Sequence, residues 1–158
     1  MAQWHNETTI HTGLNREYRV YVPESYKVGV PASLIVALHG LNETMEQFSN
    51  TIQIDKIADQ DNIIVVCPQA IKETSSGLIV WNSGVGLRRG EQLNHDVDDV
   101  GFIDALITRI SSEYAIDPKK IFAFGFSMGG FMTQRLALEL NDRIKVFASV
   151  AGTMGNMI

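Results

Sequence analysis

Residues 121–130 carry an apolar run straight into a serine that stands between glycines: Ile121-Phe122-Ala123-Phe124-Gly125-Phe126-Ser127-Met128-Gly129-Gly130. The apolar run predicts a buried β-strand, and the apolar spacing from Met128 to Leu140 predicts a helix. Ser127 would then lie on a sharp turn from strand to helix, where Gly125 and Gly129 leave out side chains that would collide. A strand that leads directly into a helix is the building unit of an α/β sheet.

Segments on both sides of this decapeptide predict the other strands. Thr8–Thr12 and Arg16–Val22 are separated by a turn, and the second alternates apolar and polar residues, so we expect an antiparallel hairpin. Ser33–Leu38 and Ile63–Cys67 are almost continuously apolar, which is typical of strands buried on both faces of a parallel sheet. A last strand is predicted at Val146–Val150.

Helices and loops are predicted between these strands. Thr44 and Gln47 have the spacing of a capping box at a helix start. Apolar residues at helical spacing predict a second helix from the Asp-rich segment before Val100 to about Tyr114. Asp117-Pro118 predicts a turn, and Trp81–Asn94 a long surface loop. The fold class is therefore α/β: one domain over residues 1–158, with a mostly parallel sheet, an antiparallel N-terminal hairpin and helices on both faces.

The chemistry of this sequence centres on Ser127. Gly125-Phe126-Ser127-Met128-Gly129 matches the Gly-x-Ser-x-Gly pattern of nucleophilic serines in a strand-turn-helix context. Its hydroxyl would stand at a helix N-terminus, where the macrodipole and free amides favour a developing negative charge. The same pentapeptide also occurs in ordinary tight turns and helix N-caps, so the interpretation needs a second element.

That second element is His39-Gly40-Leu41, directly after the predicted strand that ends at Leu38. In the hydrolase fold, a loop at this place supplies one oxyanion-hole amide, and the residue after the nucleophile supplies the other. Leu41 and Met128 are therefore the candidate oxyanion donors. His39 is expected to brace the loop, because it precedes the serine in the chain and a catalytic histidine would follow it.

The other members of a catalytic triad are not visible in the sequence. In α/β-hydrolases the triad runs Ser, then Asp or Glu, then His, and no histidine follows Ser127. Glu139 and Asp142 do follow it, and we expect them at a solvated helix end. His95 precedes the Asp-rich helix start and could approach the site, although a surface or substrate-loop role is favoured over that of a substitute base.

Several segments together resemble the polyhydroxybutyrate depolymerase and feruloyl esterase-like branch of the α/β-hydrolase superfamily. The resemblance spans almost the whole chain and rests on the following motifs: Tyr18-Arg19-Val20-Tyr21-Val22-Pro23, Leu38-His39-Gly40, Trp81-Asn82, Val97-Asp98-Asp99-Val100-Gly101-Phe102-Ile103, Gly125-Phe126-Ser127-Met128-Gly129-Gly130 and Val150-Ala151-Gly152-Thr153.

This resemblance implies a serine carboxylesterase that works through an acyl-enzyme on polyester, hydroxycinnamoyl or acetyl esters, without a metal or an organic cofactor. It assigns the nucleophile to Ser127 and the oxyanion amides to Leu41 and Met128. The substrate-loop candidates are His39, Trp81, Asn82 and His95.

The chain departs from the family pattern in two ways. Many relatives have a cysteine pair after the Trp-Asn, whereas Ser83-Gly84-Val85-Gly86 follows here, which weakens the inference of secretion. Relatives also continue through two further strands that carry the triad Asp and His. We therefore expect a truncated sheet in which the third and fourth strands exchange places and Val146–Val150 forms an exposed edge. Such an edge predicts self-association, or a second chain that completes the fold.

The bulk composition limits the partners and the compartment. The chain has 158 residues, 45% of them hydrophobic, and a net charge of -5, which argues against a nucleic-acid or anionic-membrane surface. Its one cysteine, Cys67, lies in an apolar run and is expected to pack as a small apolar side chain. No signal-peptide pattern and no membrane-spanning stretch is visible, so we expect a soluble chain, with cytoplasmic and secreted locations both open.

Two other functions remain open at this point. The chain could be a binding or interaction module that keeps the hydrolase scaffold without a base. It could also be an acyltransferase, which would pass the acyl group from Ser127 to an alcohol other than water. The isolated chain is expected to have little activity, because the triad Asp and His are missing.

Overall fold

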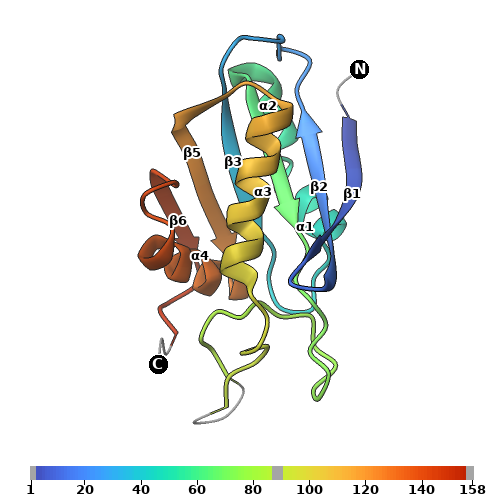
Figure 1. Ribbon diagram of the computed structural model, residues 1–158, viewed down its shortest axis with the longest axis vertical. Helices are drawn as coiled ribbons and strands as arrows, with labels where there is room; N and C mark the ends of the chain where they lie inside the picture. The colour runs from blue at the N-terminus through green and yellow to red at the C-terminus, as the bar shows by residue number, and fades with distance from the viewer. Residues whose placement is uncertain (1–2, 87–90, 156–158) are drawn as a thin grey trace.

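A six-stranded mixed sheet forms the centre of the molecule in the computed structural model, which describes residues 3–86 and 91–155 (Figure 1). Its order is β1-β2-β4-β3-β5-β6, as the family resemblance implied. β1 and β2 pair antiparallel, β2 meets β4 antiparallel, and the pairs from β4 through β3 and β5 to β6 are parallel. The strands are β1 (Gln3–His11), β2 (Leu14–Val22), β3 (Ala32–Leu38), β4 (Ile63–Pro68), β5 (Ile116–Phe126) and β6 (Val146–Val150).

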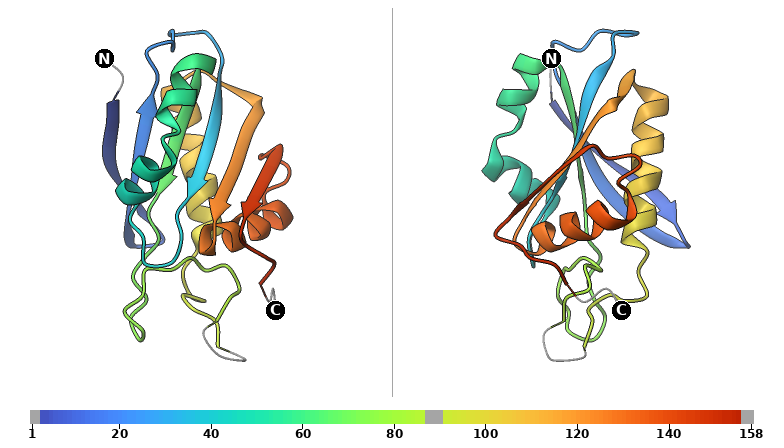
Figure 2. Two further views of the ribbon diagram at one scale, coloured as in Figure 1. Left: turned by 180° about the vertical axis from the view of Figure 1, so that it is seen from behind. Right: turned by 90° about the vertical axis from the view of Figure 1, so that its left-hand side faces the viewer.

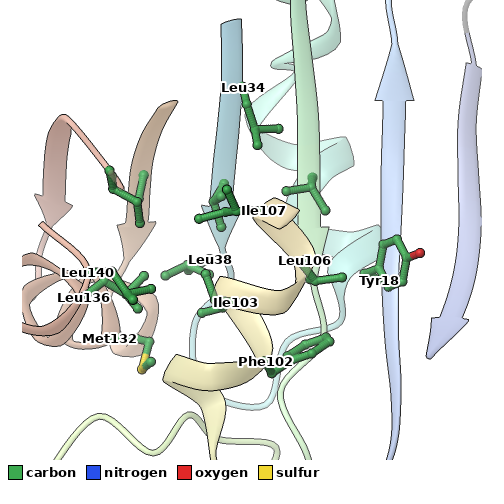
Figure 3. Packing of buried hydrophobic residues seen from close by; sticks show 14 of the residues in the cluster. Tyr18, Leu34, Leu38, Phe102, Ile103, Leu106, Ile107, Met132, Leu136 and Leu140 are labelled. Atoms are coloured by element: carbon green, nitrogen blue, oxygen red, sulfur yellow. The ribbon is translucent and has the colours of Figure 1, made fainter. Parts of the chain in front are cut away.

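Helices cover both faces of the sheet, which confirms the predicted α/β architecture (Figure 2). The helices are α1 (Met45–Ile52), α2 (Asp55–Asp61), α3 (Asp99–Glu113) and α4 (Met128–Glu139). The larger core lies under α3 and α4, where Ile103, Ile107 and Leu136 pack against Leu34 and Leu38 of the sheet (Figure 3). A smaller core, which includes the fully buried Cys67, lies under α1 and α2 on the opposite face.

Local capping fixes where α1 and α3 begin. Thr44 and Gln47 form the predicted capping box, with each side chain bonded to the backbone of the other residue. Asp98 caps α3 and accepts a hydrogen bond of 2.9 Å from the Gly101 amide. These caps satisfy amides that have no partner inside the helix, so both helices start where the sequence predicts.

Two predictions about irregular segments are wrong. Asp117-Pro118 was expected to form a turn, but both residues lie in β5, at an irregularity between the pair Ile116–Ala32 and the pair Ile121–Leu34. Extra residues on one strand of a pair can be absorbed as a bulge, and the proline is tolerated there because its missing donor costs no ladder bond.

The second correction concerns Trp81–Asn94, of which residues 87–90 lie outside the described part. It was expected to be a surface loop, yet Trp81 and Ser83 are completely buried, and Leu93 and Asn94 almost so. Its asparagines satisfy buried backbone groups: Asn94 donates to the carbonyl oxygens of Ile71 and Val80 at 2.9 and 2.7 Å. A segment rich in polar turn residues can therefore be buried, because those side chains replace water as partners.

The edge strand β6 has a free side. Val146 and Val150 keep 56% and 50% of their surface exposed, and β6 pairs only with β5 among the described strands. No helix in the described ranges is both long and apolar enough to span a membrane.

Candidate active site

Ser127 stands between β5 and α4 in a conformation that serine rarely adopts. Its φ is 54° and its ψ is -117°, which places a side chain in the half of backbone space that favours glycine. The surroundings hold this strained residue in place, since the Ser127 amide donates to the Val150 carbonyl at 2.8 Å and the Ser127 carbonyl accepts from the Phe131 amide at 3.0 Å. Strain of this kind costs about 1–3 kcal/mol and persists only where neighbouring structure imposes it.

The two glycines of the motif allow α4 to start directly against the sheet. A Cβ on Gly125 would lie 2.1 Å from the Gly129 carbonyl oxygen, and a Cβ on Gly129 would lie 2.0 Å from the Leu38 carbonyl oxygen. Both distances are far below contact, so only glycine fits. The start of α4 is thereby pressed against the end of β3, at the carboxyl edge of the parallel strands (Figure 1).

Ser127 is half-buried as a residue, and its hydroxyl makes no hydrogen bond to any residue that the structure describes. The loop after β3 comes close to it: a Cβ on Gly40 would lie 3.7 Å from the Ser127 Cβ and 3.5 Å from the Phe126 carbonyl oxygen. The structure therefore brings together the two motifs that the sequence singled out.

His39 fixes the conformation of this loop. Its Nε2 accepts from the Ala70 amide at 2.9 Å and lies 3.0 Å from the Gln69 side-chain nitrogen. Because the Ala70 amide can only donate, Nε2 carries no proton, and Nδ1 carries the proton that it donates to the Gly40 carbonyl at 2.8 Å. Burial lowers the pKa of His39 to about 4, so the ring is neutral near pH 7.

This hydrogen bond orients the neighbouring amide. The Gly40 carbonyl and the Leu41 amide belong to one planar trans peptide, so they point in opposite directions. Holding the carbonyl toward the His39 ring turns the Leu41 N–H away from it. Neither Leu41 N nor Met128 N has a hydrogen-bond partner among the described residues.

Trp81 and Asn82 also form hydrogen bonds around this loop. The Trp81 indole donates to the His39 carbonyl at 2.9 Å and its ring lies 4.9 Å from the imidazole. Asn82 donates to the carbonyl oxygens of His95 and Val97 at 3.1 and 2.8 Å. His39, Trp81 and Asn82 are all buried, so in this structure their side chains contact other parts of the protein and not the solvent.

The Asn82 amide contacts a buried ion pair that the sequence interpretation missed. Arg16 Nη2 and Asp99 Oδ1 are 2.6 Å apart with side chains only 1% and 0% exposed, and Asp99 Oδ2 accepts from the Asn82 amide at 2.7 Å. Arg16 also stacks over the Phe102 ring at 3.9 Å. The sequence could have indicated this burial, because Arg16 and the core residue Tyr18 are two positions apart on one strand and so point to the same face of the sheet.

The remaining candidates contact residues other than Ser127. His95 is 66% exposed and lies 3.1 Å from Asp96, while Glu139 pairs with Arg135 on the surface of α4. No histidine or carboxylate in the described ranges is hydrogen-bonded to Ser127. Those ranges also contain no group of three or more His, Cys, Asp or Glu side chains that could hold a metal ion.

Comparisons with known proteins show which family this chain is similar to. The family model Esterase, described as "Putative esterase", matches residues 11–156. The probable feruloyl esterase C of Aspergillus niger is 30% identical over 149 residues, which are 94% of this chain and 50% of that protein. The bifunctional acetylxylan esterase/xylanase XynS20E of Neocallimastix patriciarum is 24% identical over 147 residues, 93% of this chain and 19% of that protein. The chain thus spans half or less of the length of these relatives.

Solved structures are similar in fold. An acetyl xylan esterase from Aspergillus awamori superposes with a TM-score of 0.74 at 20% identity, over 96% of this chain and 53% of that one. A ferulic acid esterase superposes with a TM-score of 0.73 at 17% identity, over 96% and 60% of the two chains. These structures share the α/β-hydrolase fold with this chain.

Proposed function

The chain belongs to the esterase family whose model matches residues 11–156, and from this premise we propose that it carries the nucleophile and the oxyanion hole of a serine carboxylic-ester hydrolase. Ser127 is the nucleophile, and the amides of Leu41 and Met128 are the oxyanion donors. The observation that carries the proposal is the strained, unpartnered serine at the β5–α4 turn, with the Gly40 loop packed against it.

In the proposed reaction, Ser127 Oγ attacks the acyl carbon of the ester while a base removes its proton. The negative charge moves to the former carbonyl oxygen, which accepts from the Leu41 and Met128 amides. Each such donor is worth about 3–4 kcal/mol in the transition state. The alcohol then leaves with a proton, and water releases the acid from the acyl-enzyme in the same way.

Feruloyl and acetyl esters are the first substrates to test, because the similar proteins are named as feruloyl and acetylxylan esterases. Polyesters of the kind cleaved by polyhydroxybutyrate depolymerases are the second class of substrate to test. Transfer of the acyl group to an alcohol uses the same acyl-enzyme, and it differs only in the acceptor that reaches the acyl carbon.

No histidine in the described part of the chain is hydrogen-bonded to Ser127. We therefore expect the histidine that activates it to be supplied from elsewhere. By itself, then, the 158-residue chain should hydrolyse esters slowly. Enzymes that lack triad members retain about 10³–10⁴-fold over water from the oxyanion hole and substrate binding.

Labelling with a fluorophosphonate probe tests the proposal, with Ser127→Ala as the control and mass spectrometry to locate the adduct. An adduct on Ser127 supports an activated nucleophile. A folded sample that stays unlabelled would mean that the chain is either an inactive fragment without a base for Ser127 or a binding module that keeps the hydrolase scaffold.

The free edge of β6 is the surface through which we propose that a second strand adds to the sheet. Val146 and Val150 are half-exposed there, and unpaired backbone groups along an edge accept further strands. Sedimentation over a range of concentrations should reveal self-association, and Val146→Lys should weaken it. A strictly monomeric chain at all concentrations would contradict this proposal.

A further inference from the structure

Glu43 places a carboxylate beside the nucleophile. Its Oε2 accepts a hydrogen bond of 2.9 Å from the Gly40 amide. A Cβ built on Gly40 would lie 3.5 Å from this oxygen and 3.7 Å from the Ser127 Cβ. The carboxylate and the serine therefore lie on the same side of Gly40, separated by no more than the sum of these distances, about 7 Å.

No described residue forms an ion pair that would neutralise the charge of Glu43. None of the ion pairs in the described part of the chain involves Glu43. The nearby His39 ring is neutral, because its Nε2 acts as an acceptor. Glu43 is partly exposed, and Oε1 has no partner among the described residues. One carboxylate oxygen thus holds the loop, while the other is free to meet a ligand.

A charge at this distance acts on any charged group that approaches Ser127. Two unit charges about 7 Å apart in a partly exposed site interact strongly enough to change a rate severalfold, and salt reduces the effect. An anionic group is repelled by the Glu43 carboxylate, whereas neutral and hydroxyl-bearing groups are not. A hydroxyl can also donate a hydrogen bond to Oε1.

We infer that Glu43 is a specificity-determining residue, whose carboxylate disfavours substrates with a negative charge next to the scissile ester and favours neutral, hydroxyl-rich or cationic ones. The substrate part of this inference rests on the proposed function. The electrostatic part concerns the position of residue 127 alone, so it can be tested without ester hydrolysis.

The variants separate the charge from the hydrogen bond. Glu43→Gln keeps an oxygen that can accept from the Gly40 amide and removes the charge, whereas Glu43→Ala removes both. Asp61→Asn is the matched control, since Asp61 is exposed at the end of α2, before the amino end of β4 and so at the opposite edge of the sheet.

The test uses Ser127→Cys as a background, so that no catalytic base is required. A thiolate at position 127 attacks the methylene carbon of iodoacetamide or iodoacetate, a C–S bond forms, and iodide leaves. The two reagents differ in charge, so the ratio of their rates reports the local potential. Cys67 is fully buried, and Ser127→Ala measures any background reaction there.

We expect Glu43→Gln to raise the iodoacetate-to-iodoacetamide rate ratio about fivefold at low salt, an increase that shrinks at 1 M salt. Asp61→Asn should leave the ratio within about twofold. An unchanged ratio in Glu43→Gln overturns the inference. If Ser127→Cys does not fold, the same ratio is measured on Ser127 with a neutral and a carboxylate-bearing fluorophosphonate.

Failure of the proposed function would look different. In that case fluorophosphonates would not label Ser127 in any variant, while the thiol ratio would still change with Glu43→Gln. An unchanged thiol ratio in a protein that fluorophosphonates do label would refute only the role of Glu43.

Discussion

Replacing Arg16 with methionine should destabilise the protein by about 3–5 kcal/mol, because it leaves the Asp99 carboxylate buried without its partner. The two side chains are 1% and 0% exposed and 2.6 Å apart, so water cannot take the place of the guanidinium. Asp99 would keep one hydrogen bond, from the Asn82 amide. We therefore expect a loss near 3 kcal/mol, a large part of the roughly 5–15 kcal/mol that holds a domain together.

Urea denaturation followed by circular dichroism measures this loss as a change in the free energy of unfolding. Arg109→Met is the matched control, since Arg109 forms an exposed pair with Glu113 on α3 and should cost less than about 1 kcal/mol. The double variant Arg16→Met with Asp99→Leu should recover part of the loss, because no uncompensated charge remains. A cost below about 1 kcal/mol for Arg16→Met, or no recovery in the double variant, would refute the reasoning.

Other residues give further tests. Because the pKa of His39 is about 4 in the folded protein and 6.5 when unfolded, the unfolded state binds the proton first. Stability should therefore fall as the pH is lowered from about 6.5 to 4, by up to about 3 kcal/mol, and urea midpoints should fall less steeply for His39→Asn. Ser127→Gly should raise the melting temperature by relieving about 1 kcal/mol of strain, and an unchanged value would show that φ 54° is not costly there. Gly129→Ala should abolish folding or cost several kcal/mol, because its methyl group meets the Leu38 carbonyl at 2.0 Å; a soluble variant with native stability would contradict this.

The parts of the fold that follow from local patterns could be predicted from the sequence. β6 has the predicted bounds, α1 has the predicted capping box, and Ser127 lies on the predicted turn. In these places a short run of residues determines its own structure, because periodicity, caps and glycine requirements act over a few positions.

The parts that were missed depend on distant partners. Asp99 could be recognised as an acid at a helix start, but its pairing with Arg16 joins segments far apart in the sequence. Asp117-Pro118 was expected to form a turn, yet the pairing of Ile116 with Ala32 of β3 places both residues inside β5. Burial of Trp81 depends on the carbonyl of His39, which no local pattern reveals. Nonlocal contacts override local preference at each of these positions.

The contact between Gly129 and the end of β3 also has a consequence for biosynthesis. His39, Gly40 and Leu41 leave the ribosome well before Ser127, and the chain between them includes β4 and α3. The loop of residues 39–41 is therefore synthesised first, and it meets Ser127 only when β5 adds to β3 and α4 docks. If Ser127 is the proposed nucleophile, a nascent chain should react with serine-directed probes only after that late step, so probe labelling during translation would report when β5 and α4 have joined the sheet.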